Sequence, residues 1–259
     1  MTRPNRGGNW VVAVLSCLLV LGLAGAAHAA APELQLVPNE IEIGAFFEGA
    51  QVELQGTIPA GAEAVVEMLG STATEDLLRK GRRGGLWMSV GEIKVNHVPS
   101  LYLLQSSSPE MPVLTGQETP WGFAALQKVV KLSGSLEASE NDKFFQEFLE
   151  LKKHEQVYRV SPGVLKITPS PEGGSLVKGA IPLPAKVPPG KYQVRLSAVL
   201  HGSLLSQRDA ALEVRMVGFP AMLMKLAHQQ AALYGILAVV IAIVTGFIMG
   251  ILFKGKTEH

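Results

Sequence analysis

Cysteine is nearly missing from this chain of 259 residues, because Cys17 is the only one. It lies in an apolar stretch near the N-terminus, so the remaining residues offer no thiol. A chain with one cysteine forms no internal disulfide bond, and its fold depends on packing of an apolar core. Cys17 follows Val14-Leu15-Ser16 and also allows a lipoprotein acylation site. The apolar residues after it favour an ordinary position inside a signal segment.

Net charge is also low, since 23 Lys and Arg nearly balance 22 Asp and Glu. This balance gives no reason to expect nucleic acid as a partner. We find no GxSxG nucleophile motif, no phosphate loop, and no GxGxxG motif that follows a strand. The histidines show neither HExxH nor HxH spacing, so they do not indicate a metal site. We expect a protein that is not an enzyme, with no catalytic residues, no cofactor and no metal.

Residues 1–29 have the order of a secretory signal peptide. Arg3 and Arg6 come first, the apolar run 10–23 follows, and small residues end the segment at Ala27-His28-Ala29. This order of charge, apolar core and small residues predicts cleavage near Ala29. The rival interpretation is an uncleaved anchor helix, because the run is near the lower length limit for crossing a bilayer.

The second apolar segment, residues 231–253, contains no charged residue. A helix of this length spans a hydrocarbon core of about 30 Å with some tilt. Lys254 and Lys256 follow at once, which places the tail 254–259 in the cytoplasm. We therefore expect a single-pass protein of the cytoplasmic (inner) membrane, with its N-terminal body in the periplasm.

Small residues recur at every fourth position of this segment: Ala238, Ala242, Gly246 and Gly250. Rows of small residues let two transmembrane helices approach closely. The row predicts either a packing face for a partner helix or the ordinary small-residue content of a membrane segment.

Most of the body alternates between apolar and polar residues, which is typical of half-buried antiparallel strands. The alternation is clearest at 40–43, 51–58, 191–200 and 212–216. It places Val194 in the core and Arg195 at the surface, where Arg195→Asp should be nearly neutral. Tyr192 follows the turn Pro188-Pro189-Gly190, and its hydroxyl is expected to bond back to the corner backbone.

An internal repeat relates two parts of the body. Residues 38–43 resemble 162–167, Glu48-Gly49 resembles Glu172-Gly173, and Gly56-Thr57-Ile58-Pro59 resembles Gly179-Ala180-Ile181-Pro182. Chance similarity of short strand-turn segments is the alternative. The expected fold class is mainly β, with tandem immunoglobulin-like β-sandwich units at 30–115 and 157–218.

A helical insert at 116–156 separates the two units. Thr119-Pro120 predicts the start of a first helix that ends at Ser133-Gly134, and Ser139 predicts the cap of a second. The pair is expected to form a helical hairpin on the sandwich or, alternatively, a mobile arm that binds a partner. Residues 219–230 form a juxtamembrane segment before the C-terminal transmembrane helix.

Arg79, Lys80, Arg82 and Arg83 concentrate positive charge next to Gly81, Gly84 and Gly85. We expect a flexible glycine-rich loop. One interpretation is a solvated hairpin tip, and the other is a contact for an anion, a phospholipid headgroup or an acidic partner. Trp87 and Met88 come next, either as core residues or as an exposed apolar contact.

Several short motifs also support a family resemblance. They are Ile41-x-Ile43, Phe47-x-Gly49, residues 79–83 before Gly85-Leu86-Trp87-Met88, Val98-Pro99-Ser100-Leu101-Tyr102, residues 144–152, Val187-Pro188-x-Gly190-x-Tyr192, and Tyr234-Gly235 leading to Phe253-Lys254. In this order they resemble the putative transmembrane protein family of proteobacteria, often labelled alphaproteobacterial. Members are reported beside sulfite-exporter-type permeases, which implies a transport-associated role. The family implies no catalytic residues.

Two functions follow as expectations. The first is a membrane-anchored accessory or assembly protein that binds another membrane protein, with a sulfite-exporter-type permease as the implied partner. The alternative is an extracytoplasmic module that binds or senses an anion or solute through the basic segment 79–83.

Overall fold

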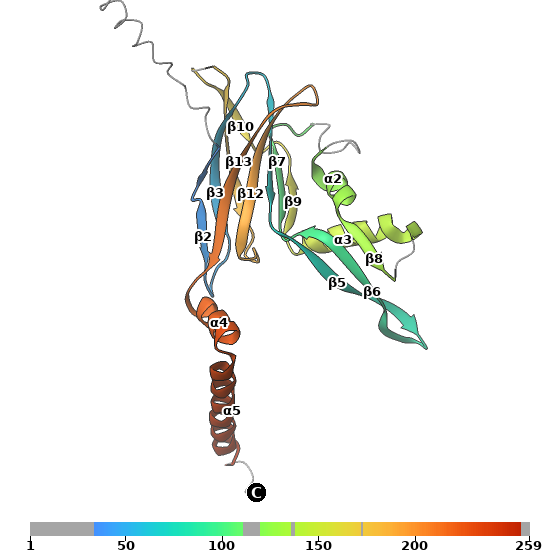
Figure 1. Cartoon of the computed structure of the whole chain (residues 1–259), viewed down its shortest axis with the longest axis vertical. Coiled ribbons are helices and arrows are strands. Elements are labelled where there is room, and N and C mark those ends of the chain that lie inside the picture. The colour runs from blue at the N-terminus through green and yellow to red at the C-terminus, as the bar shows by residue number, and fades with distance from the viewer. Residues whose placement is uncertain (1–33, 111–119, 136–137, 172, 255–259) are drawn as a thin grey trace, which may run out of the picture. The chain divides into compact units, whose positions relative to one another are not determined.

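The computed structural model describes residues 34–110, 120–135, 138–171 and 173–254 (Figure 1). The predicted signal peptide and most of the predicted cytoplasmic tail lie outside the described residues.

Two sheets form the centre of the body. Four strands are ordered β1-β3-β11-β10 and six are ordered β2-β13-β12-β4-β7-β9. Neighbours are antiparallel except in the pairs β2–β13 and β7–β9, which are parallel. The bounds of the first sheet are β1 Gln35–Val37, β3 Ala50–Ile58, β10 Lys166–Pro169 and β11 Ser175–Leu183. Those of the second are β2 Glu40–Ile43, β4 Glu63–Leu69, β7 Tyr102–Ser106, β9 Tyr158–Ser161, β12 Gly190–Leu200 and β13 Ser203–Met216.

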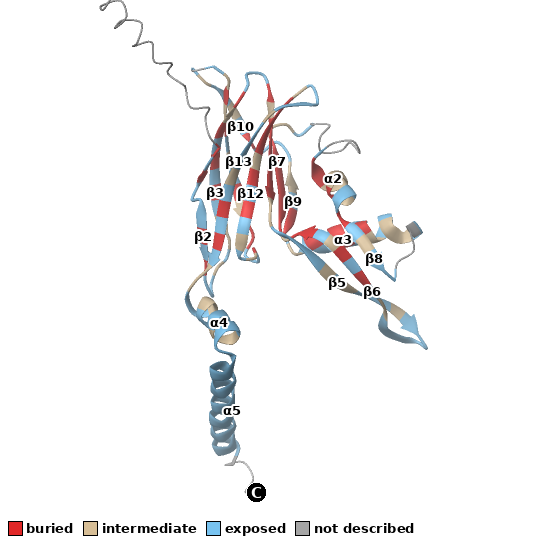
Figure 2. Ribbon diagram, viewed as in Figure 1, coloured by how far each residue is buried: buried red, intermediate tan, exposed pale blue. Residues whose placement is uncertain are grey.

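The alternation of the strands determines which side chains form the core. Buried and exposed residues alternate along β2 and β3 and along the first half of β12, visible as red and blue steps in Figure 2. Val52 and Val194 are completely buried. The four segments at which we predicted strands all lie in strands, and the mainly β fold class is confirmed. Tyr192 donates its hydroxyl to the Pro188 carbonyl at 2.5 Å, as expected for a tyrosine at a sandwich corner.

The two predicted sandwich units are not stacked in tandem but interleaved. Strand β3 of the first half pairs with β11 of the second, and β4 pairs with β12. In each sheet the two halves of the chain therefore meet at the central pair of strands, and the strands on either side of that pair follow in nearly equivalent order. This arrangement agrees with the internal repeat. Two repeat-related glycines lie on the central pair β3–β11. A Cβ at Gly56 would come within 2.6 Å of Leu196 Cδ2, and one at Gly179 within 2.5 Å of Leu165 Cδ2. Each glycine thus makes room for a core leucine.

A third sheet contains β5 (Thr72–Arg83), β6 (Leu86–Pro99) and β8 (Lys131–Gly134) in the order β5-β6-β8. The prediction of a flexible loop at 79–83 was wrong, because these residues complete strand β5. Only Gly84 and Gly85 form the turn, and both have positive φ, 59° and 84°. A two-residue hairpin turn of this kind requires positive φ at both positions, which glycine adopts freely.

The helical insert contains α2 (Gly122–Val129), the 3₁₀ turn η2 (Ala138–Glu140) and α3 (Asn141–His154). Both predicted helices exist, but they do not form a simple hairpin. The first ends before Val130, because residues 131–134 pair with β6 as strand β8. The second has Glu140, not Ser139, as its N-cap residue. Phe145, Phe148 and Leu149 of α3 are buried, which favours packing on the body over a mobile arm.

Two helices complete the described chain. Helix α4 spans Gly218–Gln229 and occupies the predicted juxtamembrane segment. Helix α5 spans Ala231–Lys254. Among the described residues, Ala231–Phe253 is the one helix segment long and apolar enough to cross a membrane, with a mean hydropathy of 2.9.

Candidate functional site

The β5–β6 hairpin carries all four residues of the predicted basic site. At its base β8 adds a third strand, pairing with β6 from Ile93 to Asn96. Beyond that point the pairs Lys80–Ser89, Gly81–Met88, Arg82–Trp87 and Arg83–Leu86 form a two-stranded ribbon. Isolated two-stranded ribbons are marginally stable in water, so the base of the hairpin must hold its outer end in place.

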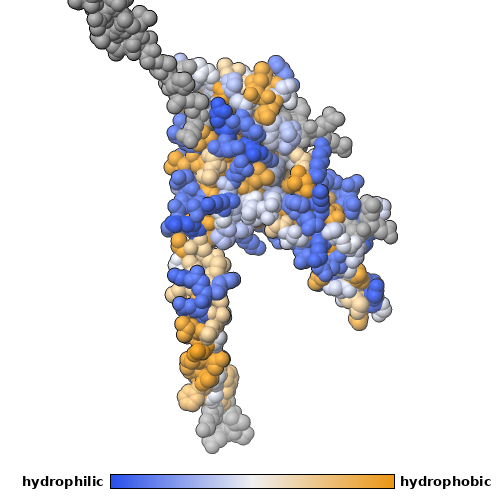
Figure 3. Space-filling view, viewed as in Figure 1, coloured by the Kyte–Doolittle hydropathy of each residue, from blue (hydrophilic) through white to orange (hydrophobic). Residues whose placement is uncertain are grey.

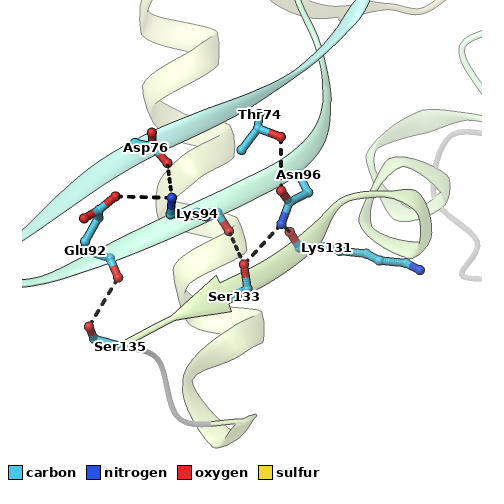
Figure 4. Close-up of polar contacts among 8 residues, drawn as sticks. All are labelled: Thr74, Asp76, Glu92, Lys94, Asn96, Lys131, Ser133 and Ser135. Atoms are coloured by element: carbon cyan, nitrogen blue, oxygen red, sulfur yellow. Dashed lines mark hydrogen bonds and ion pairs between the residues drawn. The ribbon is translucent and has the colours of Figure 1, made fainter.

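Side-chain contacts brace this base (Figure 4). Asn96 accepts a hydrogen bond from the Thr74 hydroxyl at 3.1 Å and donates to Ser133 Oγ at 3.2 Å, which joins the three strands. Lys94 lies 3.7 Å from an oxygen of Asp76 and 3.8 Å from one of Glu92. Ile93 and Val95 are buried. The base is thus held by polar contacts and by apolar packing.

The helical insert also contacts strand β5 of the hairpin. Lys152 of α3 contacts Glu75 of β5 at 2.7 Å, and only 11% of the lysine side chain is exposed. Arg79 donates two hydrogen bonds, at 2.9 and 2.8 Å, to the carboxylate of Glu140. Paired guanidinium-carboxylate bonds of this kind fix orientation strongly. Arg79 therefore serves the contact between hairpin and insert.

The other three predicted cations, Lys80, Arg82 and Arg83, are exposed along the ribbon. A hollow of about 360 Å³ lies beside the ribbon, lined by Leu78, Arg79, Lys80, Glu140, Lys143, Phe144 and Glu147. Its lining carries both signs of charge, and it includes two of the four predicted cations. The four predicted residues share one hairpin, but the structure does not gather them around one cavity.

The tip of the hairpin is apolar as well as basic. Leu86 is 69% exposed and Trp87 is 70% exposed, and Met88 is also exposed. The guanidinium carbon of Arg82 lies 6.0 Å from the centroid of the Trp87 ring, within cation–π range. Figure 3 shows hydrophobic and hydrophilic surface close together at this end of the hairpin. Of the two interpretations of Trp87 and Met88, the exposed one is confirmed.

A buried polar cluster joins the sandwich to the insert. Tyr102 of β7 donates its hydroxyl to Glu67 Oε1 of β4 at 2.7 Å and accepts the backbone N–H of Gly122 at 2.8 Å. Gly122 is the first residue of α2 and has a φ of 85°. The contact ties the start of the insert to the six-stranded sheet.

Burial raises the pKa of Glu67 above its ordinary value of 4.5, against the opposing effects of the Tyr102 hydrogen bond and the Arg195 charge. Burial also raises the pKa of Tyr102, and the neighbouring Glu67 raises it further. The hydroxyl therefore stays protonated and remains a donor. A lone acid among apolar residues at 65–68 was the sequence signal for this cluster, and our reading of the sequence missed it.

The predicted packing face lies on α5. Ala238, Ala242, Gly246 and Gly250 are all exposed, and no described element packs on this helix along its apolar window. A Cβ placed at Gly246 or Gly250 would meet no atom within 4 Å. The face is therefore open to a neighbouring helix.

The described residues also bear on metal and nucleotide chemistry. Within them, no three His, Cys, Asp or Glu residues gather in a way that suits a metal ion. Our statement that the sequence has no phosphate loop overlooked residues 250–257, which spell the pattern GxxxxGK[ST]. Residues 250–254, however, form the last turn of α5. A phosphate loop lies between a strand and a helix, so the pattern lacks its structural context.

A family model described as "Putative transmembrane protein (Alph_Pro_TM)" matches residues 33–255. The chain belongs to this family. The match covers the sandwich, the hairpin, the insert and α5, so it includes every residue of both candidate sites. No curated protein matches the chain. As a member of this transmembrane family, the chain is a membrane protein, and the residues that the structure describes contain one candidate span, near the C-terminus.

Proposed function

We propose that this member of the family is a non-enzymatic accessory or assembly subunit of the cytoplasmic membrane. Its body lies in the periplasm after removal of the signal peptide, and its C-terminus lies in the cytoplasm. The protein binds another membrane protein, and α5 provides the contact within the bilayer.

The observation that carries this proposal is the complete exposure of an apolar helix. None of the apolar window of α5 is buried against the described body. Lipid tails alone can surround such a helix, but Gly246 and Gly250 leave room for a second backbone. Close approach lets van der Waals contacts accumulate between helices in a bilayer, where the hydrophobic effect no longer drives association.

The partner that fits this face is a transmembrane helix with a complementary small-residue surface. A sulfite-exporter-type permease is the first candidate, because the family resemblance implies a transport-associated role. In such a complex α5 would dock on the permease, and the sandwich with its hairpin would stand at the periplasmic entrance.

The test is a substitution on the packing face. Gly246→Ile places a branched side chain in the open space and leaves the segment apolar, so insertion should be unchanged. We expect recovery of the membrane partner from mild detergent to fall about five- to tenfold, in line with typical energies of helix contacts in membranes. The measurement is a pull-down of tagged protein with quantitative mass spectrometry.

Val240→Ile and Val244→Ile are the controls, because they place an isoleucine on α5 away from the row. They should leave recovery unchanged. Equal recovery of one partner with all three variants would reduce α5 to an anchor and refute its role as the contact.

A further inference from the structure

The outer end of the β5–β6 hairpin exposes apolar side chains on both of its faces. Paired residues on neighbouring strands point to the same face of a ribbon. Trp87 and Arg82 therefore share one face, while Leu86 and Arg83 share the other, together with Met88 and Gly81. The residues from Arg82 to Ser89 are exposed without interruption.

This two-sided pattern selects the kind of surface that the tip fits. A partner strand that pairs with an edge of the ribbon leaves both faces open, and a protein that packs on one face leaves the side chains of the other face in water. A medium that surrounds the end of the hairpin removes Trp87, Leu86 and Met88 from water together. The interface of a lipid bilayer is such a medium, and tryptophan rings are favoured there.

The charge of the tip points to the same surface. Residues 77–91 contain four cations and no acid, and the described acid that pairs with a cation of this segment is Glu140, which holds Arg79. The other three cations, Lys80, Arg82 and Arg83, are exposed beside the apolar tip of the hairpin. Cations beside interfacial apolar groups are attracted to anionic lipids, and each strengthens attachment about fivefold near such a membrane.

We propose that the tip of the β5–β6 hairpin docks into an anionic phospholipid surface. Trp87, Leu86 and Met88 enter the interface, while Lys80, Arg82 and Arg83 contact lipid phosphates. The turn at Gly84 and Gly85 has no side chain to oppose entry, and its positive φ angles make it tight. The docking is a second membrane contact besides α5, and it holds independently of any protein partner.

The experiment uses the full chain in lipid nanodiscs. Cys17→Ser removes the single native cysteine, and Ser89→Cys then carries an environment-sensitive fluorophore beside the tip. Nanodiscs contain phosphatidylcholine alone or equal parts of phosphatidylcholine and phosphatidylglycerol, with a quenching group on the lipid chains. We expect a blue-shifted, lipid-quenched signal in the anionic discs and a much weaker one in the neutral discs.

A label at Thr72→Cys is the control within the same hairpin, since Thr72 is exposed and lies about 35 Å along the strand from the turn. It should remain in water in both kinds of disc. Arg82→Gln with Arg83→Gln should weaken attachment of the tip about twentyfold. Trp87→Ser with Leu86→Ser should abolish quenching. Lys166→Gln with Lys178→Gln removes two exposed cations from another sheet and should change nothing.

Three results would overturn the proposal. The first is a Ser89 label that stays in water in anionic discs, and the second is equal quenching in both lipids. The third is loss of quenching in phosphate buffer but not in chloride buffer of the same ionic strength, which would identify a free-anion site. Near-ultraviolet circular dichroism of each variant verifies that the body remains folded.

Discussion

Val194→Asp is expected to lower the free energy of unfolding by more than about 4 kcal/mol. Val194 lies in the middle of β12 and is completely buried. An aspartate there leaves a charge in the core without a described cation to pair with it, or requires that the carboxyl be protonated. For a body of this size we expect the melting temperature of the detergent-solubilised chain to fall by at least about 10 °C.

Gln193→Asp is the matched control, because it adds the same side chain one residue earlier on the exposed face. Its partners across the neighbouring strands are Ala211 and Leu69, so it meets no like charge directly opposite. The control should lower the melting temperature by no more than about 2 °C. Similar melting temperatures for both variants would contradict the assignment of the two faces of β12.

Tyr102→Phe is expected to lower the free energy of unfolding by about 3 kcal/mol. The substitution removes the hydroxyl that donates to a buried carboxylate and accepts the Gly122 N–H. Tyr158→Phe is the control. That hydroxyl donates to the Pro99 carbonyl at 2.9 Å, and the loss of this neutral bond should cost about 1 kcal/mol. The measurement is urea unfolding in detergent, followed by circular dichroism.

The loss of unfolding free energy that Tyr102→Phe causes should also rise with pH. Because the pKa of Glu67 is raised in the folded protein, protonation of Glu67 favours the fold. This contribution is fully present below pH 4.5 and is lost as the pH rises through the folded pKa. Without the Tyr102 donor the folded pKa is higher still, so the variant continues to lose stability over a wider range. The coupling would be refuted if Tyr102→Phe lowered the free energy of unfolding by the same amount below pH 4.5 and at neutral pH.

The strands that the sequence predicted well are those with one face in the core. Alternation at 40–43 and 191–200 depends on residues in direct contact with that core, so it can be read locally. The interleaving of the two halves could not be read in this way. Both halves contain similar strands, and only long-range pairing, such as β3 with β11, decides whether each closes on itself or on the other.

The strand at 131–134 was missed for a related reason. Its residues follow a helix and have no alternation of their own, and their conformation comes from pairing with the edge of β6. Tertiary contacts often override local preference in this way. The four cations were recognised from the sequence as one cluster. Arg79 pairs with Glu140 whereas the other three cations face solvent, and this difference depends on a helix more than fifty residues away in the sequence.

Arg195 shows the limit of assigning a residue to the surface from alternation alone. We expected Arg195→Asp to be nearly neutral. In the sheet Arg195 lies opposite Asp209 on one side and Glu67 on the other, and its Nε donates to Asp209 at 2.9 Å. An aspartate at this position would place three acids in one row across three strands, where like charges destabilise a sheet. The structure therefore changes this expectation from a neutral to a destabilising substitution.

The central claim, a periplasmic body anchored by α5 with a cytoplasmic C-terminus, is tested most directly by fusing a reporter enzyme that is active only outside the cytoplasm. A fusion after Gly218, at the start of α4, should be active, and a fusion after His259 should be inactive, because α5 and the lysines behind it separate the two positions. Activity after His259 combined with no activity after Gly218 would contradict the claim.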